Sequence, residues 1–184
     1  MRRLLLVLLL PPLVGIGGCS GNPLGEPQFQ NVVDTVILGA LVGTPISVPS
    51  AYSISAGAPV RTDQTSQFDF AYNVDSAGRR VFLPPAVLGL TSTTAPPGFL
   101  PTDDAFDQID RAPLNGYLTF DTIPIAVGDR FIVRGRVVCT VLGVPLYAKL
   151  QVLSFDDADR QVTFQVLANR NCGFRSLLPG TPED

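Results

Sequence analysis

Several segments of the chain alternate between hydrophobic and polar positions with the two-residue period of half-buried β-strands. The clearest early example runs from Gln67 to Asp75, and one face of it carries only apolar or aromatic side chains. That face consists of Phe68, Phe70, Tyr72 and Val74, and the other of Asp69, Ala71 and Asn73. Residues 75–78, Asp-Ser-Ala-Gly, then form a turn sequence, so the pattern predicts a hairpin with a partner strand from Arg80 to Leu83.

The C-terminal half has the most regular pattern and predicts three strands, at 130–139, 146–155 and 161–168. In the first, Arg134 and Arg136 share one face. Its other face holds Phe131, Val133 and Val137. In the second strand, one face holds Ala148, Leu150 and Val152, and the other holds Tyr147, Lys149 and Gln151. In the third strand, the side chains of Val162, Phe164 and Val166 share one face. A turn of mainly acidic residues at 156–160 separates the last two strands, which indicates an up-down-up meander.

Elsewhere the pattern is weaker. It predicts a buried strand at 34–41, strand-like pieces near Ile46 and Tyr52, and a strand at 117–120, while Pro84 to Pro101 is expected to be a long surface loop. A short helical turn is expected from a cap at Thr102 or Asp103 through Arg111, with Phe106 and Ile109 facing inward.

Together these elements predict an all-β fold: a single antiparallel β-sandwich or flattened barrel with one short helical turn. The 17 glycines and 17 prolines agree with short strands joined by turns. We expect this domain to span residues 31–176, followed by a flexible C-terminal tail at 177–184.

The N-terminus has the features of an export signal. Arg2 and Arg3 precede an apolar run from Leu4 to Ile16, which is too short and too rich in proline for a spanning helix. Ile16-Gly17-Gly18-Cys19 resembles the lipobox of bacterial lipoproteins, which implies removal of residues 1–18 and lipid modification of Cys19, including a palmitate-type acyl group. An ordinary signal peptide with a chance cysteine is the alternative.

The resemblance also implies a location. Two or more acyl chains hold a protein on a bilayer where one binds only marginally. Ser20 after the cysteine fits the sorting rule for the outer membrane, and residues 19–30, rich in Gly and Pro, are expected to form a lipidated tether. The expected site is the bacterial cell envelope, lipid-anchored at the outer membrane.

The charge balance and the cysteines limit the possible partners and predict a disulfide. Without residues 1–18, 166 residues remain, and 11 basic residues face 16 acidic ones, which argues against nucleic acid as a partner. Cys139 and Cys172 lie in a compartment that permits disulfides, and the meander brings both to one end of the sheet. We expect a disulfide between them, with two buried thiols as the alternative.

Three segments resemble a known family. Residues 147–155 with 162–166 are similar to the closing hairpin of HmuY-type lipoproteins, residues 68–72 to an aromatic-Asp-aliphatic-Ala-Phe strand, and residues 131–134 to a Tyr-x-Ile-Arg strand. The resemblance implies an all-β fold and a small ligand, which is haem in the best-known members. The family's histidine or methionine ligands cannot be carried over, because the chain has no histidine and its only methionine is Met1.

The candidate chemistry is correspondingly sparse. Tyrosine can bind haem iron, and the chain offers Tyr52, Tyr72, Tyr117 and Tyr147, although packing explains them equally. Four residues could form a ligand or anion patch, or simply an outer sheet face paired with acids: Arg134, Arg136, Lys149 and Tyr147. The densest acidic group could bind calcium loosely or be a solvated helix face: Asp103, Asp104, Asp107 and Asp110.

No triad or G-x-S-x-G elbow is present, and the turn acids at 156–159 lack the glycine of a calcium loop. We therefore expect no catalytic residues, no metal and no cofactor. The expected function is a non-catalytic envelope lipoprotein that binds an envelope protein or a small ligand, with an HmuY-like binder and a carboxylate-dependent hydrolase as alternatives.

Overall fold

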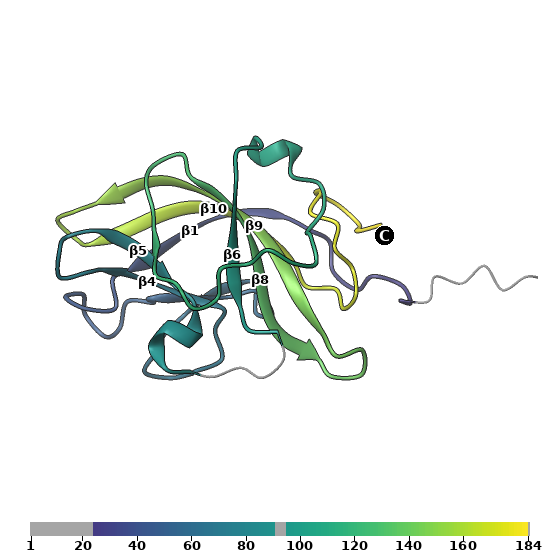
Figure 1. Ribbon diagram of the computed structural model, residues 1–184, viewed down its shortest axis with the longest axis horizontal. Coiled ribbons are helices and arrows are strands. Elements are labelled where there is room, and N and C mark those ends of the chain that lie inside the picture. Colours follow the sequence, from purple (N-terminus) through teal and green to yellow (C-terminus); the bar gives the residue numbers. More distant parts are fainter. Residues whose placement is uncertain (1–23, 91–94, 184) are drawn as a thin grey trace, which may run out of the picture.

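The computed structural model describes residues 24–90 and 95–183, and these form two antiparallel sheets packed as a sandwich (Figure 1). The expected all-β sandwich is confirmed, and the two sheets are separate rather than closed into a barrel. The long sheet contains, in spatial order, β1 (Val33–Gly39), β10 (Gln161–Asn169), β9 (Val144–Asp156), β8 (Arg130–Cys139) and β6 (Gly98–Thr102).

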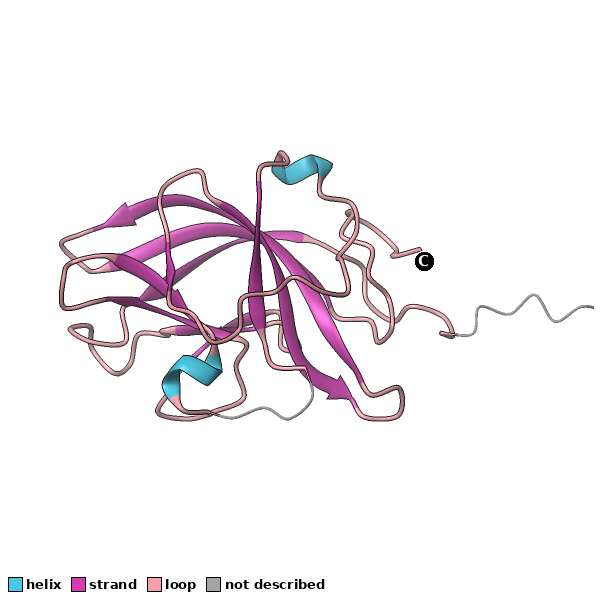
Figure 2. Cartoon of the chain, in the orientation of Figure 1, coloured by secondary structure: helices cyan, strands magenta, loops and turns pink. Residues whose placement is uncertain are grey.

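The short sheet is built from the middle of the chain and lies against the first. Its strands, in spatial order, are β3 (Ala58–Val60), β2 (Ala51–Ser53), β4 (Phe70–Val74), β5 (Arg80–Leu83) and β7 (Ile123–Pro124). The predicted hairpin of β4 and β5 is present, and Asp75 Oδ1 accepts the N–H groups of Ala77 and Arg79 in its turn. Figure 2 shows how little helix accompanies these strands.

Alternation along the strands builds the core between the two sheets. Ala148, Leu150 and Val152 of β9 all point into it, as the sequence predicts, together with the three apolar residues of β10. Aromatic rings fill the centre, and Phe82 of the short sheet stacks on Phe99 of the long sheet with centroids 5.4 Å apart. Such ring pairs add about 0.5–1.5 kcal/mol each to the burial of their surface, so this cluster contributes strongly to the contact between the sheets.

A second cluster covers the outer face of the long sheet, which the sequence pattern assigns to solvent. It consists of Ile109, Ala112, Ile132, Tyr147, Leu167 and Leu177, with Leu100, Phe106 and Tyr117 at its border. The segment after β6 and the C-terminal segment supply its cover. The expected flexible tail at 177–184 is therefore wrong over its described part, because Leu177 is fully buried and Gly180 pairs with Asn31.

The expected helical turn is much shorter than predicted. A single 3-10 turn, η2 (Phe106–Gln108), replaces the helix from Thr102 or Asp103 to Arg111, and neither predicted residue caps it. Ala105 precedes η2, and Thr102 instead accepts the N–H of Asp104. Ile109 is buried as expected, because burial on the long sheet decides its orientation without helical periodicity.

One loop assignment and one strand assignment also change. The segment from Pro84 to Pro101, expected to be a surface loop, contains the 3-10 turn η1 (Pro85–Leu88) and most of β6. The strand predicted at 117–120 is reduced to one bridge between Leu118 and Phe99. Prolines and exposed positions hide β6 in the sequence pattern, since it is an edge strand that can tolerate Pro101.

The C-terminal meander is confirmed. β8, β9 and β10 are neighbours, and the Cys139–Cys172 disulfide is present with a Cα–Cα distance of 5.6 Å. Cys139 ends β8 and Cys172 follows β10, so the bridge forms beyond the strand ends, where the chain converges across the intervening β9.

The described part of the predicted tether at 19–30 packs on the domain near this disulfide. Asn171 Oδ1 accepts the N–H groups of Gln28 and Phe29, at 2.7 and 2.9 Å, and its amide donates to the Phe29 carbonyl. The ordered domain thus begins before residue 31. No helix in the described ranges has the length and hydrophobicity needed to span a bilayer.

Candidate functional site

A cleft of about 740 Å³ opens at one end of the sandwich, where β6 ends and β8 begins, and the β7 segment of the other sheet contributes to its wall. Its lining consists of Pro101, Thr102, Asp103, Asp104, Leu118, Asp121, Thr122, Ile123, Pro124, Gly128, Asp129, Arg130 and Phe131. Its volume lies within the range of about 300–1,000 Å³ that ligand pockets occupy. We call it the β6–β8 cleft.

The charge in the β6–β8 cleft is mainly negative. Four carboxylates line it, from Asp103, Asp104, Asp121 and Asp129, against the single guanidinium of Arg130. Asp129 Oδ2 accepts the Ala126 N–H at 2.8 Å, which fixes this carboxylate in its turn. Four acids around one base favour a ligand that carries positive charge or hydrogen-bond donors.

Arg130 supplies the positive charge in this lining. Its Nη2 donates to the Asp103 carbonyl oxygen at 3.3 Å, which ties the start of β8 to the end of β6. Its Nε is buried without a hydrogen-bond partner among the described residues. The floor is apolar, because Ile123 and Phe131 are only 4% and 3% exposed. The cleft therefore combines a buried apolar floor with a polar rim.

The predicted patch of Arg134, Arg136, Lys149 and Tyr147 is divided by a β-bulge. The pairing of β8 with β9 shifts between Arg134 and Val137, so Arg134 and Arg136 do not share a face. Arg134 lies opposite Tyr147 and stacks over the Tyr117 ring at 4.8 Å, and its guanidinium donates to the Pro96 carbonyl. Arg134 and Tyr147 thus form one pair on the outer face.

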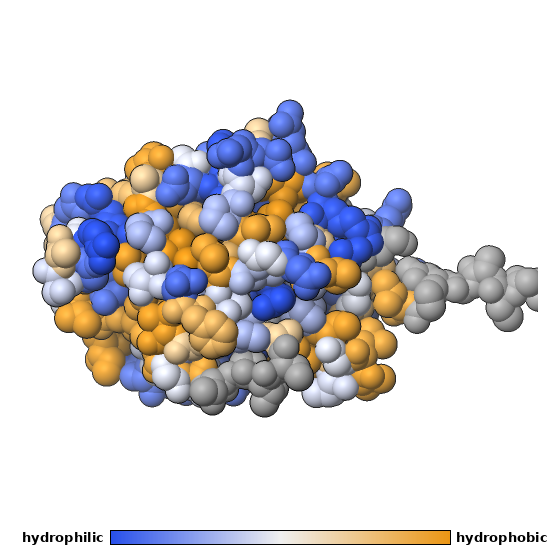
Figure 3. Space-filling view, in the orientation of Figure 1, coloured by the Kyte–Doolittle hydropathy of each residue, from blue (hydrophilic) through white to orange (hydrophobic). Residues whose placement is uncertain are grey.

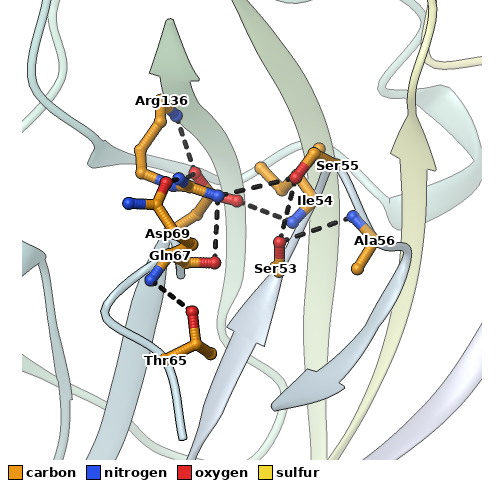
Figure 4. A network of polar contacts seen from close by, with 8 residues as sticks. All are labelled: Ser53, Ile54, Ser55, Ala56, Thr65, Gln67, Asp69 and Arg136. Carbon is orange, nitrogen blue, oxygen red and sulfur yellow. Dashed lines mark hydrogen bonds and ion pairs between the residues drawn. The ribbon is translucent and has the colours of Figure 1, made fainter. Parts of the chain in front are cut away.

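Arg136 instead belongs to a buried polar network with Asp69 (Figure 4). Asp69 is 2% exposed and accepts the N–H of Ile54 through Oδ2 and the N–H of Arg136 through Oδ1, both at 2.6 Å. The Arg136 guanidinium extends to the side chain and carbonyl of Gln67. Burial raises the pKa of Asp69, and the bonds from Arg136 oppose this shift.

Lys149 is buried beneath the segment that covers the long sheet. Its Nζ donates to the Ile109 carbonyl at 2.8 Å and lies 4.8 Å from the centre of the Phe106 ring. Desolvation lowers the pKa of its amine, against the weaker opposing effect of Asp107 and Asp110. A ligand that used Lys149 would have to displace this cover.

The four tyrosines considered as iron ligands are placed as packing residues. Tyr52, Tyr72 and Tyr147 are at most 4% exposed, and the Tyr117 hydroxyl donates to the Pro113 carbonyl at 2.8 Å. Burial raises the pKa of all four hydroxyls, so each stays protonated. These positions offer no accessible phenolate.

The acidic group at 103–110 is also divided. Asp103 and Asp104 line the β6–β8 cleft, whereas Asp107 and Asp110 lie beside Lys149, because η2 is too short to align them on one face. No cluster of three or more metal-ligating side chains occurs among residues 24–90 and 95–183. Of the turn acids, Asp157 pairs with Arg80 at 2.6 Å.

Sequence reasoning did not find the β6–β8 cleft. Its walls come from residues 101–104, 118–124 and 128–131, which the sequence assigns to the start of a helical turn, to loops and to strand ends. Pairing of β6 with the start of β8 joins Thr102 to Arg130, and the pairing of β7 with β5 places Ile123 and Pro124 beside them. The predicted lipidation site Cys19 and the signal at 1–18 lie outside the described residues.

Comparisons with known proteins leave the family open. No family model matches the chain. No curated protein and no solved structure matches it either.

Proposed function

We propose that the chain is a lipid-anchored, non-catalytic lipoprotein of the bacterial cell envelope that binds a cationic partner in the β6–β8 cleft. The lipobox-like sequence at residues 16–19 supports the anchor, and the position of Ser20 after it favours the outer membrane. The single observation that carries the binding role is the cleft of about 740 Å³ with four carboxylates on its wall.

The chemistry of the wall defines the partner. Carboxylates accept hydrogen bonds and attract ammonium and guanidinium groups, while buried Ile123 and Phe131 provide an apolar floor. A basic segment of an envelope protein, with Lys or Arg beside aliphatic residues, matches both features. A small amine could use the same wall with fewer contacts.

The anchor is tested on protein extracted from membranes. Its intact mass is expected to lack residues 1–18, to include the lipid on Cys19, and to be two hydrogens lighter for the Cys139–Cys172 bridge. A Cys19→Ser variant should lose both the lipid and the membrane retention. Equal processing and retention of that variant would overturn the anchor.

Binding in the cleft is tested with a synthetic peptide of alternating Lys and Leu, followed by amide chemical shifts. The peptide should perturb the amides of Thr102, Asp121 and Arg130. An Asp103→Asn/Asp121→Asn double variant should bind several-fold more weakly, because each exposed ion pair contributes about 0.2–1 kcal/mol. Binding should also weaken with salt.

The matched control is Asp34→Asn, an exposed acid on β1 at the opposite edge of the long sheet from β6. It removes one negative charge without touching the cleft and should leave binding within error of the parent. Perturbations spread evenly over the surface, or equal losses in the control, would contradict a site in the cleft.

A further inference from the structure

The turn between β8 and β9 exposes an unusual amount of aliphatic surface. Val141 is 97% exposed and Leu142 45%, and Val138 just before the turn is 37% exposed. The turn is nevertheless well defined, because the Cys139 carbonyl accepts the N–H groups of Leu142 and Gly143. Exposed aliphatic surface that is gathered at one place on a domain marks a site of interaction with a protein or a membrane.

The N-terminal segment leaves the domain at the same end. A Cβ built on Gly173 would lie 2.6 Å from Leu24 Cδ2 and 3.4 Å from Leu142 Cδ1. Leu24, the first described residue, and Leu142 at the hairpin tip therefore both lie next to Gly173. The Cys139–Cys172 disulfide joins the base of the hairpin to the same segment. Figure 3 shows hydrophobic surface at the lower right, over the β8–β9 turn, and again where the grey trace begins.

Phe29 extends this apolar end. It is 42% exposed, and the Arg170 guanidinium lies 4.3 Å from its ring centre. Aromatic rings and arginine side chains both favour the interface between lipid headgroups and acyl chains. We call the surface formed by Leu24, Phe29, Val138, Val141 and Leu142 the apolar end.

The short segment between Cys19 and Leu24 limits the distance from the apolar end to the proposed lipid anchor. Only four residues lie between Cys19 and Leu24, and each of the five steps along the chain spans at most about 3.6 Å, so Leu24 lies within about 18 Å of the lipidated residue. We propose that the apolar end rests on the membrane and inserts Val141 and Leu142 into its interface. This inference rests on the proposed lipid anchor at Cys19.

The charges of the domain agree with this orientation. The acidic turn at residues 156–159 lies at the far end of β9 from Val144, and the β6–β8 cleft lies at the far end of β8 from Cys139. An anionic membrane surface repels carboxylates, so both acidic regions are placed where the repulsion is weakest. The same orientation turns the cleft away from the bilayer toward its partner.

The absence of tryptophan from the sequence allows a single-probe experiment. The processed, lipidated Val141→Trp protein is reconstituted in phosphatidylglycerol–phosphatidylethanolamine vesicles, with and without brominated acyl chains. Its emission is expected to shift to shorter wavelength and to lose most of its intensity with brominated lipid. The control is Val127→Trp, where the valine is 62% exposed and lies just before β8, at the opposite end of that strand from the β8–β9 turn; its emission should be unaffected.

Flotation of the same vesicles separates the two hypotheses. If the protein does not float with the lipid, or a Cys19→Ser form floats equally well, the anchor fails. If the lipidated protein floats but emission from the Val141→Trp variant is as insensitive to bromine as emission from the Val127→Trp control, the anchor stands and the orientation is wrong. A blue shift without bromine quenching would also overturn the orientation, since a second copy or another protein would then cover the turn.

Amide hydrogen exchange of the parent protein gives a readout without any introduced aromatic residue. Residues 140–142 should exchange several-fold more slowly on vesicles than in detergent-free Cys19→Ser protein, while residues 126–128 should not change. If residues 140–142 slow on vesicles no more than residues 126–128 do, insertion of the β8–β9 turn is contradicted.

Discussion

Asp69 lies in the loop before β4 of the short sheet, yet its Oδ1 accepts the backbone N–H of Arg136 on β8 of the long sheet at 2.6 Å. The bulge in β8 removes this N–H from the ladder with β9, and the carboxylate replaces the missing acceptor. Gly135 permits the approach, because a Cβ there would lie 3.0 Å from Asp69 Oδ1 and from Ile54 Cδ1. One buried side chain thus ties the two sheets together.

An Asp69→Asn substitution should therefore lower the free energy of unfolding by about 1–3 kcal/mol, the cost of an unsatisfied buried polar group. Asparagine keeps the shape but has one acceptor oxygen, so it cannot accept both the Ile54 and the Arg136 N–H. Urea unfolding followed by circular dichroism measures the change. Asp63→Asn, which breaks an exposed pair with Arg61, is the matched control and should cost less than about 1 kcal/mol. Equal losses in both variants would show that Asp69 makes no special contribution.

Gly135→Ala tests the close approach itself. The added methyl must displace either the Asp69 carboxylate or the Ile54 side chain, and both are buried, so the variant should be less stable by about 1–3 kcal/mol. Gly78→Ala is not a suitable control, because Gly78 has a positive φ of 77°. The control is Ala126→Gly, which removes a methyl group from an exposed loop outside the Asp69 network. A fully stable Gly135→Ala protein would mean that β8 can shift without loss.

The strands were predictable where one face meets a continuous core. Along β9, Ala148, Leu150 and Val152 alternate with polar neighbours, and the sequence pattern identifies the strand and its buried face correctly. The same pattern places Lys149 in solvent, which is wrong because η2 and the C-terminal segment cover that face. A local sequence pattern cannot predict that segments distant in the sequence will cover one face of a sheet.

The sites were less predictable, for the same reason. A bulge is invisible in a period-two pattern, so Arg134 and Arg136 read as one patch although they separate in the structure. The β6–β8 cleft depends on the pairing of Thr102 with Arg130 and has no local signal. The Cys139–Cys172 bridge was predictable because meander topology alone brings strand ends together.

Removal of that disulfide should be costly. The two cysteines are 33 residues apart, and closing such a loop restricts the unfolded chain by about 3–4 kcal/mol. A Cys139→Ala/Cys172→Ala variant is expected to lose about this much unfolding free energy in urea. The single Cys139→Ala variant serves as its control, since it breaks the same bridge and should be about equally destabilised. A double variant as stable as the parent would contradict the expectation.

The C-terminal segment offers a test of the cover over the long sheet. Leu177 is fully buried in the second cluster, so Leu177→Ala should cost about 2–5 kcal/mol. The neighbouring Leu178 is 47% exposed, and Leu178→Ala should change stability far less. Thermal unfolding of the two variants makes the comparison. Similar melting temperatures for both would restore the interpretation of this segment as a flexible tail.

The pH dependence of stability should reveal the buried amine of Lys149, which is the only lysine in the chain. Desolvation lowers its pKa in the folded protein below the ordinary 10.5. Between the folded pKa and 10.5 the unfolded chain holds a proton that the folded protein lacks, so the free energy of unfolding rises with pH in that window. Below the folded pKa this contribution is constant.

A Lys149→Met variant keeps the aliphatic length and removes the titration. The unfolding free energy of the parent minus that of the variant should increase toward pH 10.5, the ordinary pKa of the amine, and the tyrosine contributions common to both proteins should cancel. Urea unfolding at several alkaline pH values measures the difference. A difference that stays level or falls across this range would mean that the Lys149 amine is no harder to charge in the folded protein than in the unfolded chain.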